Sequence, residues 1–164
     1  RHCGAMIRSP CEIPLKNAEQ TADLARRIGA RLTGGDCILL EGSIGAGKTH
    51  FARALIQSRL ATPEDVPSPT FTLVQIYDLP DAELWHADLY RLSDPDEAHE
   101  LGLADAFDTA ICLVEWPDKL GPDTPAHALH LRLTQDPDDP DARQISLRWS
   151  DPKWTQKLDP LTDD

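Results

Sequence analysis

The chain has 164 residues, of which 40% are hydrophobic, and this is enough for one domain with a substantial core. Its formal net charge of −12 argues against a broad nucleic-acid surface, because binding to phosphates depends on clustered Lys and Arg. No stretch is long and apolar enough to span a bilayer, and no secretory signal is visible at the start. The four Cys show no CxxC or zinc spacing, so we expect a cytoplasmic protein in a reducing compartment, with buried thiols at Cys37 and Cys112.

Three segments are expected along the chain. Residues 1–16 are predicted to be an N-terminal extension, and residues 1–5 precede the only methionine and are interpreted as foreign to the natural chain. Residues 17–150 form the folded domain. Residues 151–164 form an acidic C-terminal tail.

The first predicted helix begins at Asn17. Asn17 is a preferred N-cap residue, and Gln20 follows it at the spacing of a capping box. Leu24 and Ile28 then mark one apolar face, and the glycines at residues 34–35 are expected to stop the helix. The helix either packs plainly on a sheet or also forms a wall for the base of a nucleotide.

The most informative stretch, residues 39–49, is an apolar run that ends in a glycine-rich loop. It matches the phosphate-binding pattern GxxxxGK[ST] at Gly42, Gly47, Lys48 and Thr49. Glycines let backbone N–H groups surround phosphate oxygens, Lys48 can reach the β and γ phosphates, and Thr49 can offer its hydroxyl to Mg²⁺. The strand pattern before the loop and the helical stripe after it favour a nucleotide site over a turn that only imitates one. The residues expected to bind the nucleotide here are Gly42, Ser43, Ile44, Gly45, Ala46, Gly47, Lys48 and Thr49.

An irregular loop and a hairpin are predicted next. Residues 63–70 contain three prolines, whereas residues 71–77 are rich in β-branched and aromatic side chains and are predicted to form a strand. Ser68 and Thr70 are candidates for sensing the γ-phosphate, or they only stiffen the turn. The strand predicted at residues 83–88 follows so closely that the two strands should pair antiparallel, which makes the sheet mixed.

Two acids, Asp88 and Glu115, each end a predicted strand. Open α/β sheets bind ligands at the carboxyl ends of their strands, so one acid is expected to hold Mg²⁺ and the other to orient a water molecule. The sequence leaves open which acid does which. Trp116 either stacks near the nucleotide or seals the core. His86 has no ligand spacing with another metal-binding residue and is assigned to packing or to the surface.

The last predicted strands lie at residues 129–133 and 144–149, where apolar and polar residues alternate. They are expected to form a hairpin. Beyond Asp151 we expect weak order, with Trp154 and Leu158 as possible anchors.

Taken together, four blocks of sequence resemble the TsaE family, the ATPase component of the bacterial machinery that makes threonylcarbamoyladenosine in tRNA. The resemblance covers roughly residues 17–149 and implies an α/β fold, a P-loop NTPase-like three-layer sandwich with a mixed, partly antiparallel central sheet. It also implies ATP and Mg²⁺ as ligands. The blocks are GSIGAGKT at residues 42–49, SPTFTLV at 68–74, HADLYRL at 86–92 and LVEWP at 113–117.

Catalytic roles follow from the same resemblance. It implies that Lys48 and Thr49 serve the phosphates and Mg²⁺ and that Glu115 is a second Mg²⁺ contact. Asp88 matches the family's strand-end acid, and Thr70 matches its switch-like threonine. Lys48, Thr70, Asp88 and Glu115 are therefore the residues expected to act in catalysis.

Two further nucleotide contacts are implied, together with two departures from the family. Trp116 matches a tryptophan beside the metal, and Arg143 matches an arginine that borders the adenine. Ser43 stands where the family usually has Asp, and His50 stands where a smaller residue is common. These departures bear on the tuning of turnover or on partner contacts, because neither side chain is needed for the phosphate cradle.

The resemblance also implies partners. Members of the family act on a complex of TsaD and TsaB and reset it between catalytic cycles, so tRNA is met only through the partner and no membrane is involved. We expect in-line attack of water on the γ-phosphate, slow in the isolated protein and completed by a cationic group of the partner.

Three other functions would leave different features in the sequence. A small-molecule kinase would need an Arg-rich lid and an acceptor pocket, and no Arg-rich lid segment follows the predicted sheet core. A GTPase would carry an Asn-Lys-x-Asp stretch, which is absent from the sequence. A nucleotide-dependent docking module with negligible turnover would differ from an ATPase mainly in rate.

Overall fold

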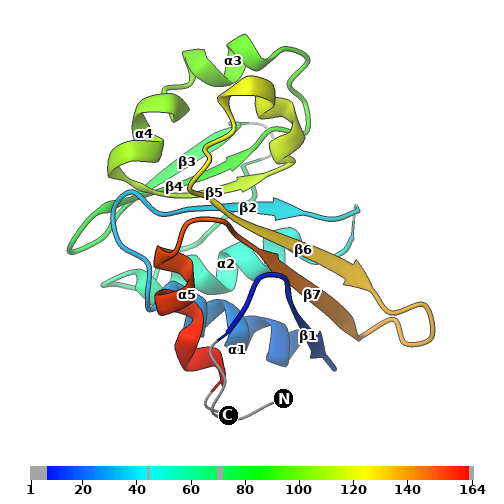
Figure 1. Ribbon diagram of the computed structural model, residues 1–164. Helices are drawn as coiled ribbons and strands as arrows, with labels where there is room; N and C mark the ends of the chain where they lie inside the picture. The colour runs from blue at the N-terminus through cyan, green and yellow to red at the C-terminus, as the bar shows by residue number, and fades with distance from the viewer. Residues whose placement is uncertain (1–6, 44, 70–71, 163–164) are drawn as a thin grey trace.

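The computed structural model describes residues 7–43, 45–69 and 72–162. Within these ranges one mixed sheet has the strand order β1-β7-β6-β2-β5-β4-β3 and is covered by helices on both faces (Figure 1). Its strands are β1 (Cys11–Leu15), β2 (Cys37–Glu41), β3 (Val74–Asp78), β4 (Glu83–Asp88), β5 (Ile111–Glu115), β6 (Leu129–Gln135) and β7 (Arg143–Arg148). The helices are α1 (Ala18–Gly29), α2 (Lys48–Arg59), α3 (Pro95–Glu100), α4 (Leu103–Thr109) and α5 (Lys153–Leu158), with 3₁₀ turns η1 (Pro117–Asp123) and η2 (Asp159–Thr162).

The centre of the sheet is parallel and its two sides are antiparallel. Strands β4, β5, β2 and β6 run parallel, whereas β3 pairs antiparallel with β4, and β7 pairs antiparallel with both β6 and β1. Both predicted hairpins are confirmed. The predicted three-layer α/β sandwich with a mixed sheet is confirmed as well.

Both faces of the central strands are buried. Ile38 and Leu40 of β2 pack into the core between the sheet and helices α1, α2 and α5. Cys37 and Leu39 pack into the core on the opposite face, which is shared with α3 and α4. A parallel strand covered on both sides needs a continuous apolar run, which explains the composition of β2 and β5. The carboxyl ends of these strands are therefore held in place by packing on both faces of the sheet.

The cap of α1 is the one predicted from sequence. The Asn17 side chain accepts a hydrogen bond from the Gln20 N–H at 2.9 Å, and the Gln20 side chain accepts one from the Lys16 N–H at 2.8 Å. The helix ends at Gly29, earlier than the predicted stop at residues 34–35. A Cβ at Gly29 would lie 2.8 Å from Leu55 Cγ, so this glycine allows α1 to lie close against α2.

The third strand begins later than predicted. Residues 71–77 were predicted as strand from their composition, but β3 spans Val74–Asp78. Leu73 has φ of 68°, and its N–H bonds to the Pro69 carbonyl at 2.7 Å, so the chain is still turning at this point. Local turn geometry overrides β propensity here.

The expectation of weak order beyond Asp151 is wrong. Residues after it form α5 and η2, and the two predicted anchors, Trp154 and Leu158, are both fully buried. The Trp154 indole N–H donates to the His127 carbonyl at 2.7 Å. Trp154 and Leu158 are four residues apart and so lie on one face of a helix, but these two positions alone did not predict the helix.

The N-terminal boundary predicted at residue 17 also needs correction. Strand β1 completes the sheet by pairing with β7, and Ile7 is buried in the core. Residues 7–15 thus belong to the folded domain. Cys11, Ile13 and Leu15 alternate with Glu12 and Pro14, which is the pattern of an edge strand that tolerates proline, and it was overlooked.

The thiols lie where they were predicted. Cys37 and Cys112 are fully buried on neighbouring strands, and neither forms a disulfide. Burial raises the pKa of the Cys37 thiol well above its ordinary value and raises the pKa of Cys112 to about 12, so both thiols stay protonated.

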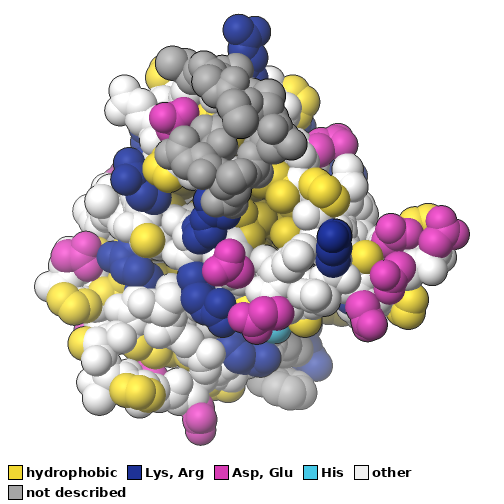
Figure 2. Space-filling model, turned by 90° about the horizontal axis from the view of Figure 1, so that it is seen from below, with side chains coloured by type: hydrophobic (Ala, Val, Ile, Leu, Met, Phe, Trp, Pro, Cys, Tyr) yellow, Lys and Arg dark blue, Asp and Glu magenta, His cyan; other side chains and the backbone are white. Residues whose placement is uncertain are grey.

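One protruding loop of the surface is rich in acidic side chains. The connection between β6 and β7 extends to the right in Figures 1 and 2 and exposes Asp136, Asp138, Asp139 and Asp141. On the face seen in Figure 2, Lys and Arg side chains lie among Asp and Glu. Among the described residues, no helix has both the length and the apolar character needed to cross a membrane.

Candidate functional site

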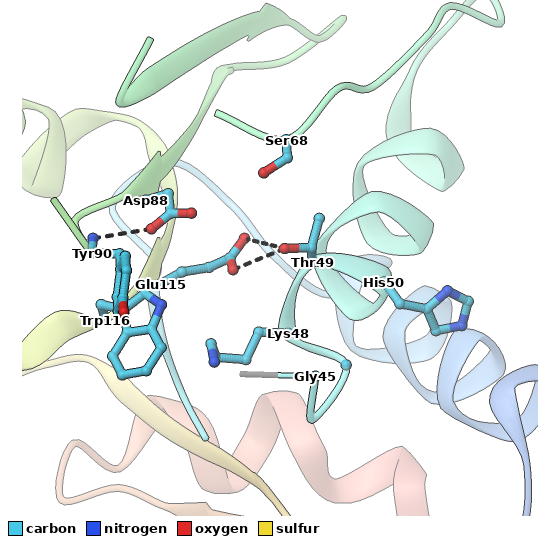
Figure 3. Close-up of a pocket in the computed structure, with 10 residues that line it drawn as sticks. Gly45, Lys48, Thr49, His50, Ser68, Asp88, Tyr90, Glu115 and Trp116 are labelled. Atoms are coloured by element: carbon cyan, nitrogen blue, oxygen red, sulfur yellow. Dashed lines mark hydrogen bonds between the residues drawn. The ribbon is translucent and has the colours of Figure 1, made fainter. Parts of the chain in front are cut away.

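A cavity of about 390 Å³ opens where β2, β4 and β5 end and α2 begins (Figure 3). This is the edge at which open α/β sheets place their ligands. We call it the phosphate cavity. Its lining residues are Gly45, Gly47, Lys48, Thr49, His50, Ser68, Asp88, Tyr90, Glu115 and Trp116.

The glycine-rich loop follows a path that larger residues could not adopt. Gly42 has φ of 146°, and a Cβ there would lie 2.6 Å from the Leu133 carbonyl oxygen. Gly47, with φ of 106°, is the N-cap of α2 and offers no side chain to the first N–H groups of the helix. These N–H groups and the positive end of the helix dipole therefore face the phosphate cavity, an arrangement that suits an anion.

Lys48 is held against this loop. Its ammonium nitrogen lies 2.6 Å from the Gly42 carbonyl and 3.0 Å from the Ser43 carbonyl, and 4.2 Å from the centre of the Trp116 ring. Burial lowers the pKa of Lys48, and the nearby carboxylates of Glu115 and Asp88 oppose that shift. The side chain thus brings a positive charge, partly removed from water, to the mouth of the loop.

Thr49 and Glu115 form a pair of oxygen ligands. The Thr49 hydroxyl donates to the Glu115 carboxylate, with Oγ1 at 3.0 Å from Oε1 and 3.3 Å from Oε2. Neighbouring ligands of octahedral Mg²⁺ lie about 3 Å apart, since each Mg–O distance is about 2.0–2.1 Å. The pair therefore has the chemistry and the spacing that two ligands of one Mg²⁺ ion require.

The rest of such a coordination shell is not supplied by protein side chains. The described residues contain no group of three or more His, Cys, Asp or Glu side chains able to hold a metal. Mg²⁺ commonly takes one or two protein ligands and completes its shell with phosphate oxygens and water. The site fits Mg²⁺ carried with a nucleotide, rather than a permanently bound metal.

Asp88 lies opposite Glu115 in the β4–β5 register and faces the same cavity. Its carboxylate accepts a hydrogen bond from the Tyr90 N–H at 3.0 Å. Burial raises the pKa of Asp88, and the negative charge of Glu115 adds to this rise, whereas the Tyr90 N–H, His86 and Lys48 oppose it. Such a carboxylate takes up a proton more readily than an exposed one.

Trp116 covers one side of the cavity and packs against the core that contains α3 and α4. It adopts a left-handed backbone conformation with φ of 59°, which is uncommon outside glycine. Its ring lies between Lys48 and Tyr90, whose ring centre is 4.9 Å away (Figure 3). The same side chain thus lines the cavity and packs against the core.

A second cavity of about 430 Å³ lies on the other side of the loop. Arg143 of β7 borders it and donates to the Ala46 carbonyl at 2.9 Å, so it braces the loop. The start of α1 forms a wall, and His50 lines both cavities and contacts the Ala18 carbonyl at 3.0 Å. We call this the flanking cavity. Its lining residues are Asn17, Ala18, Glu19, Thr21, Ala46, Gly47, His50, Pro140, Asp141 and Arg143.

A family model described as "Threonylcarbamoyl adenosine biosynthesis protein TsaE" matches residues 15–145. The chain belongs to the TsaE family. The resemblance found in the four sequence blocks is thereby confirmed for the greater part of the chain.

Individual TsaE proteins are similar to this chain over different shares of their length. The Rickettsia bellii protein is 38% identical over 125 residues, which are 74% of this chain and 86% of the relative. The Bacillus subtilis protein is 36% identical over 124 residues, 75% of this chain and 77% of the relative. The Rickettsia felis protein is 39% identical over 104 residues, and the match spans 61% of its length. All three are named tRNA threonylcarbamoyladenosine biosynthesis protein TsaE.

A solved structure agrees with the fold. The crystal structure of Bacillus subtilis YdiB superimposes with a TM-score of 0.76 at 25% sequence identity, covering 97% of this chain and 98% of that one. The similarity covers nearly the whole chain, and so it is not confined to residues 17–150.

This TsaE family member brings most of its predicted site residues together. Gly45, Gly47, Lys48, Thr49, Asp88, Glu115 and Trp116 line the phosphate cavity, as does Ser68. Ala46 and Arg143 border the flanking cavity, and Gly42 and Ser43 contact Lys48 through their carbonyls. Ile44 and Thr70 lie outside the described residues.

Two residues of the site were missed by sequence reasoning. His86 is fully buried and contacts the Glu115 carboxylate at 2.7 Å, and Tyr90 lines the phosphate cavity. His86 could have been found from its position two residues before Asp88, because alternate residues of a strand lie on the same face of the sheet. A search for metal ligands by their spacing along the chain does not find a residue that contacts Glu115 from the adjacent strand.

Proposed function

We propose that this protein binds ATP with Mg²⁺ and hydrolyses the γ-phosphate, as the ATPase subunit for threonylcarbamoyladenosine modification of tRNA. The observation that carries the proposal is the convergence in one cavity of an uncapped helix start, the Lys48 ammonium and the Thr49–Glu115 oxygen pair. The place in tRNA modification rests on the family and on the names of its members.

Each group of the loop has a distinct task in this proposal. The N–H groups of the loop and of the first turn of α2 bind the phosphate oxygens, and Lys48 leaves the Gly42 and Ser43 carbonyls to contact the β and γ phosphates. Thr49 and Glu115 would hold Mg²⁺ between them. When bound, Mg²⁺ neutralises charge that develops on the phosphate oxygens.

The structure favours a division of labour between the two acids. Glu115 accepts a hydrogen bond from the Thr49 hydroxyl, and this contact supports a role for Glu115 in metal binding. Asp88 faces the cavity one strand away, and its raised pKa suits a group that orients the attacking water and accepts its proton. We therefore assign metal binding to Glu115 and water positioning to Asp88.

The adenine and ribose are assigned to the flanking cavity. This cavity shares Gly47 and His50 with the phosphate cavity, so a single nucleotide can occupy both. Arg143 borders the adenine in this arrangement while it braces the loop through Ala46. The start of α1 then acts as a wall for the base.

The proposed partner is a complex of TsaD and TsaB, on which ATP hydrolysis acts to support turnover. Of the described residues that line the phosphate cavity, Lys48 alone is a Lys or Arg. Phosphoryl transfer commonly uses a second cation in the transition state, and supplying it from another protein accelerates hydrolysis by about 10³–10⁵ in known cases. We therefore propose slow hydrolysis alone and faster hydrolysis with the partner.

Calorimetry with MgATP tests the binding step. The wild-type chain should bind, and Lys48→Ala should bind at least about tenfold more weakly, because it loses a charge-assisted hydrogen bond worth about 1.5–3 kcal/mol. Lys119→Ala is the control, since Lys119 lines neither cavity. Absence of MgATP binding to the folded wild-type chain would overturn the proposal.

The hydrolysis step needs a separate measurement. Inorganic phosphate release should be slow for the isolated chain and should rise when TsaD and TsaB are added. An unchanged rate would contradict the role of the partner. Transfer of labelled phosphate to a metabolite in place of water would indicate a kinase.

A further inference from the structure

His86 lies directly behind the proposed metal ligand. It is fully buried on β4, and its Nε2 is 2.7 Å from Oε2 of Glu115. In the β4–β5 register His86 is opposite Leu113, two residues before the pair formed by Asp88 and Glu115. The imidazole therefore approaches the Glu115 carboxylate from the interior of the sheet, on the side away from the cavity mouth.

The direction of this hydrogen bond follows from its partner. A carboxylate oxygen only accepts, so Nε2 of His86 carries the proton and donates it. The other ring nitrogen, Nδ1, is buried and has no hydrogen-bond partner in the described part of the chain. A buried polar atom without a partner costs stability, and an aliphatic residue would fill the same space without that cost.

The Glu115 carboxylate is held from two sides as a result. Oε2 contacts the His86 Nε2–H, whereas Oε1 is the oxygen nearer the Thr49 hydroxyl. A glutamate side chain otherwise rotates about its last bond and exchanges its two oxygens. The bond from His86 selects one orientation of the carboxylate.

We propose that His86 is a positioning residue, which fixes Glu115 so that Oε1 faces Thr49 and the Mg²⁺ ion these two side chains would share. The inference rests on the proposed binding of MgATP and deepens it. Residues that orient a metal ligand typically change metal affinity or activity by about 10–100-fold when they are removed.

Two variants of similar length separate this role from simple filling of the core. In His86→Gln the side-chain amide can place an N–H donor near the position of Nε2, whereas His86→Met fills the space without a donor. His86→Met should raise the Mg²⁺ concentration needed for half-maximal ATP binding by about 10–100-fold. His86→Gln should stay much closer to the wild type.

The main readout is metal binding rather than turnover. Free Mn²⁺, used in place of Mg²⁺, is followed by electron paramagnetic resonance in the presence of ADP and each variant. Nucleotide binding with EDTA, which depends on the loop and not on the metal, should be the same for both variants and the wild type. Equal metal affinity of the wild type and His86→Met would overturn the inference.

A double-mutant cycle gives an independent check. If His86 acts through Glu115, then adding His86→Met to Glu115→Gln should weaken metal binding little beyond Glu115→Gln alone. Additive losses would overturn the inference. If His86→Met fails to fold, His86→Gln is compared with His86→Asn, whose shorter amide does not reach Oε2, and equal metal affinities would then overturn it.

The two hypotheses fail in different ways. Metal-dependent nucleotide binding by the wild type that His86→Met leaves unchanged overturns only the role of His86. Lack of any metal-dependent nucleotide binding by the folded wild type overturns the proposed function, and the role of His86 with it.

Discussion

At the scale of single residues, the Glu115 carboxylate joins three elements of the fold. It belongs to β5, accepts from Thr49 at the start of α2, and is held by His86 of β4. The relative position of these three elements is set by two cores packed on opposite faces of the sheet. Packing of the sheet therefore sets the relative positions of Thr49, His86 and Glu115.

Asp88→Asn should separate catalysis from binding. The substitution keeps the shape of the side chain but removes the group assigned to the water, so hydrolysis should fall by about 10²–10⁴ while MgATP still binds. The folded state raises the pKa of Asp88, so the ionised carboxylate destabilises the fold at neutral pH. The variant should accordingly be as stable as the wild type or more stable, by thermal unfolding at pH 7.

The exposed acid Asp78 provides the control for this substitution. Asp78→Asn should change neither hydrolysis nor binding. Full hydrolytic activity of Asp88→Asn would show that another group positions the water, and Glu115 would then be the next residue to test.

At this scale, the residues that line the cavity could be predicted from sequence where they lie within one short stretch or at the end of a strand. The loop residues, Lys48 and Thr49 are adjacent in the chain, and Asp88 and Glu115 were found because each ends a predicted strand. The contact between His86 and Glu115 was not predictable in the same way. It depends on the pairing of β4 with β5, which local patterns do not specify.

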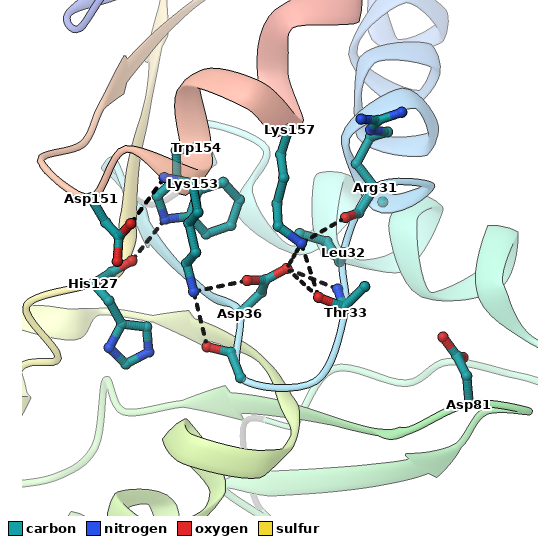
Figure 4. A network of polar contacts seen from close by, with 12 residues as sticks. Arg31, Leu32, Thr33, Asp36, Asp81, His127, Asp151, Lys153, Trp154 and Lys157 are labelled. Atoms are coloured by element: carbon teal, nitrogen blue, oxygen red, sulfur yellow. Dashed lines mark hydrogen bonds and ion pairs between the residues drawn. The ribbon is translucent and has the colours of Figure 1, made fainter.

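At the scale of elements, α5 shows how a short helix docks through charge as well as apolar contact. Lys153 and Lys157 reach the buried Asp36 carboxylate at 2.9 and 2.6 Å (Figure 4). Burial alone would raise the pKa of Asp36, but the hydrogen bonds from Lys157, the Thr33 N–H and Lys153 outweigh it and lower that pKa. The helix is thus fastened to the segment that leads into β2.

Asp36→Asn should reveal this fastening in the pH dependence of stability. Because the folded pKa lies below the ordinary value of 3.8, the ionised carboxylate stabilises the fold above that pH, and this contribution is lost as the pH falls through the folded pKa. Denaturant unfolding should show the variant about 2–4 kcal/mol less stable at pH 7. The difference should shrink below pH 3.8.

Asp23, an exposed acid on α1, gives the matched control. Asp23→Asn should follow the wild type within about 0.5 kcal/mol at each pH. A constant difference between Asp36→Asn and the wild type across the acid range would mean that the ionisation of Asp36 does not contribute.

The elements that sequence placed well are those with a repeating pattern and a clear cap. Helix α1 has both, and β2 and β5 are continuous apolar runs. Helix α5 was missed because its only apolar pattern is the pair Trp154 and Leu158 within six residues, and its stability comes from partners distant in sequence. The start of β3 was misplaced because the left-handed turn at Leu73 has no glycine to mark it.

At the scale of the whole molecule, the negative net charge opposes direct binding to the RNA that this protein is proposed to help modify. The formal charge is −12, and a row of exposed aspartates projects from the connection between β6 and β7 (Figure 2). Several of the Lys and Arg side chains are engaged with acids, as Arg59 is with Asp81 at 3.1 Å. Long-range repulsion from tRNA phosphates is the expected net effect.

The isolated chain should accordingly show no measurable tRNA binding at physiological salt. An electrophoretic mobility shift with labelled tRNA tests this directly. A shift should appear only when TsaD and TsaB are present. Tight, salt-sensitive binding by the chain alone would contradict the division of labour proposed above.

The pairing of β1 with β7 has a consequence for the order of events during synthesis. Leu15 is opposite Arg143 in that ladder, so β1 enters the sheet through a strand that is synthesised 128 residues later. At translation speeds of about 5–20 residues per second, β1 waits roughly 7–26 s for its neighbour. Nascent chains arrested before residue 143 should therefore remain open to proteases at their N-terminal end, whatever structure the middle of the chain has already gained.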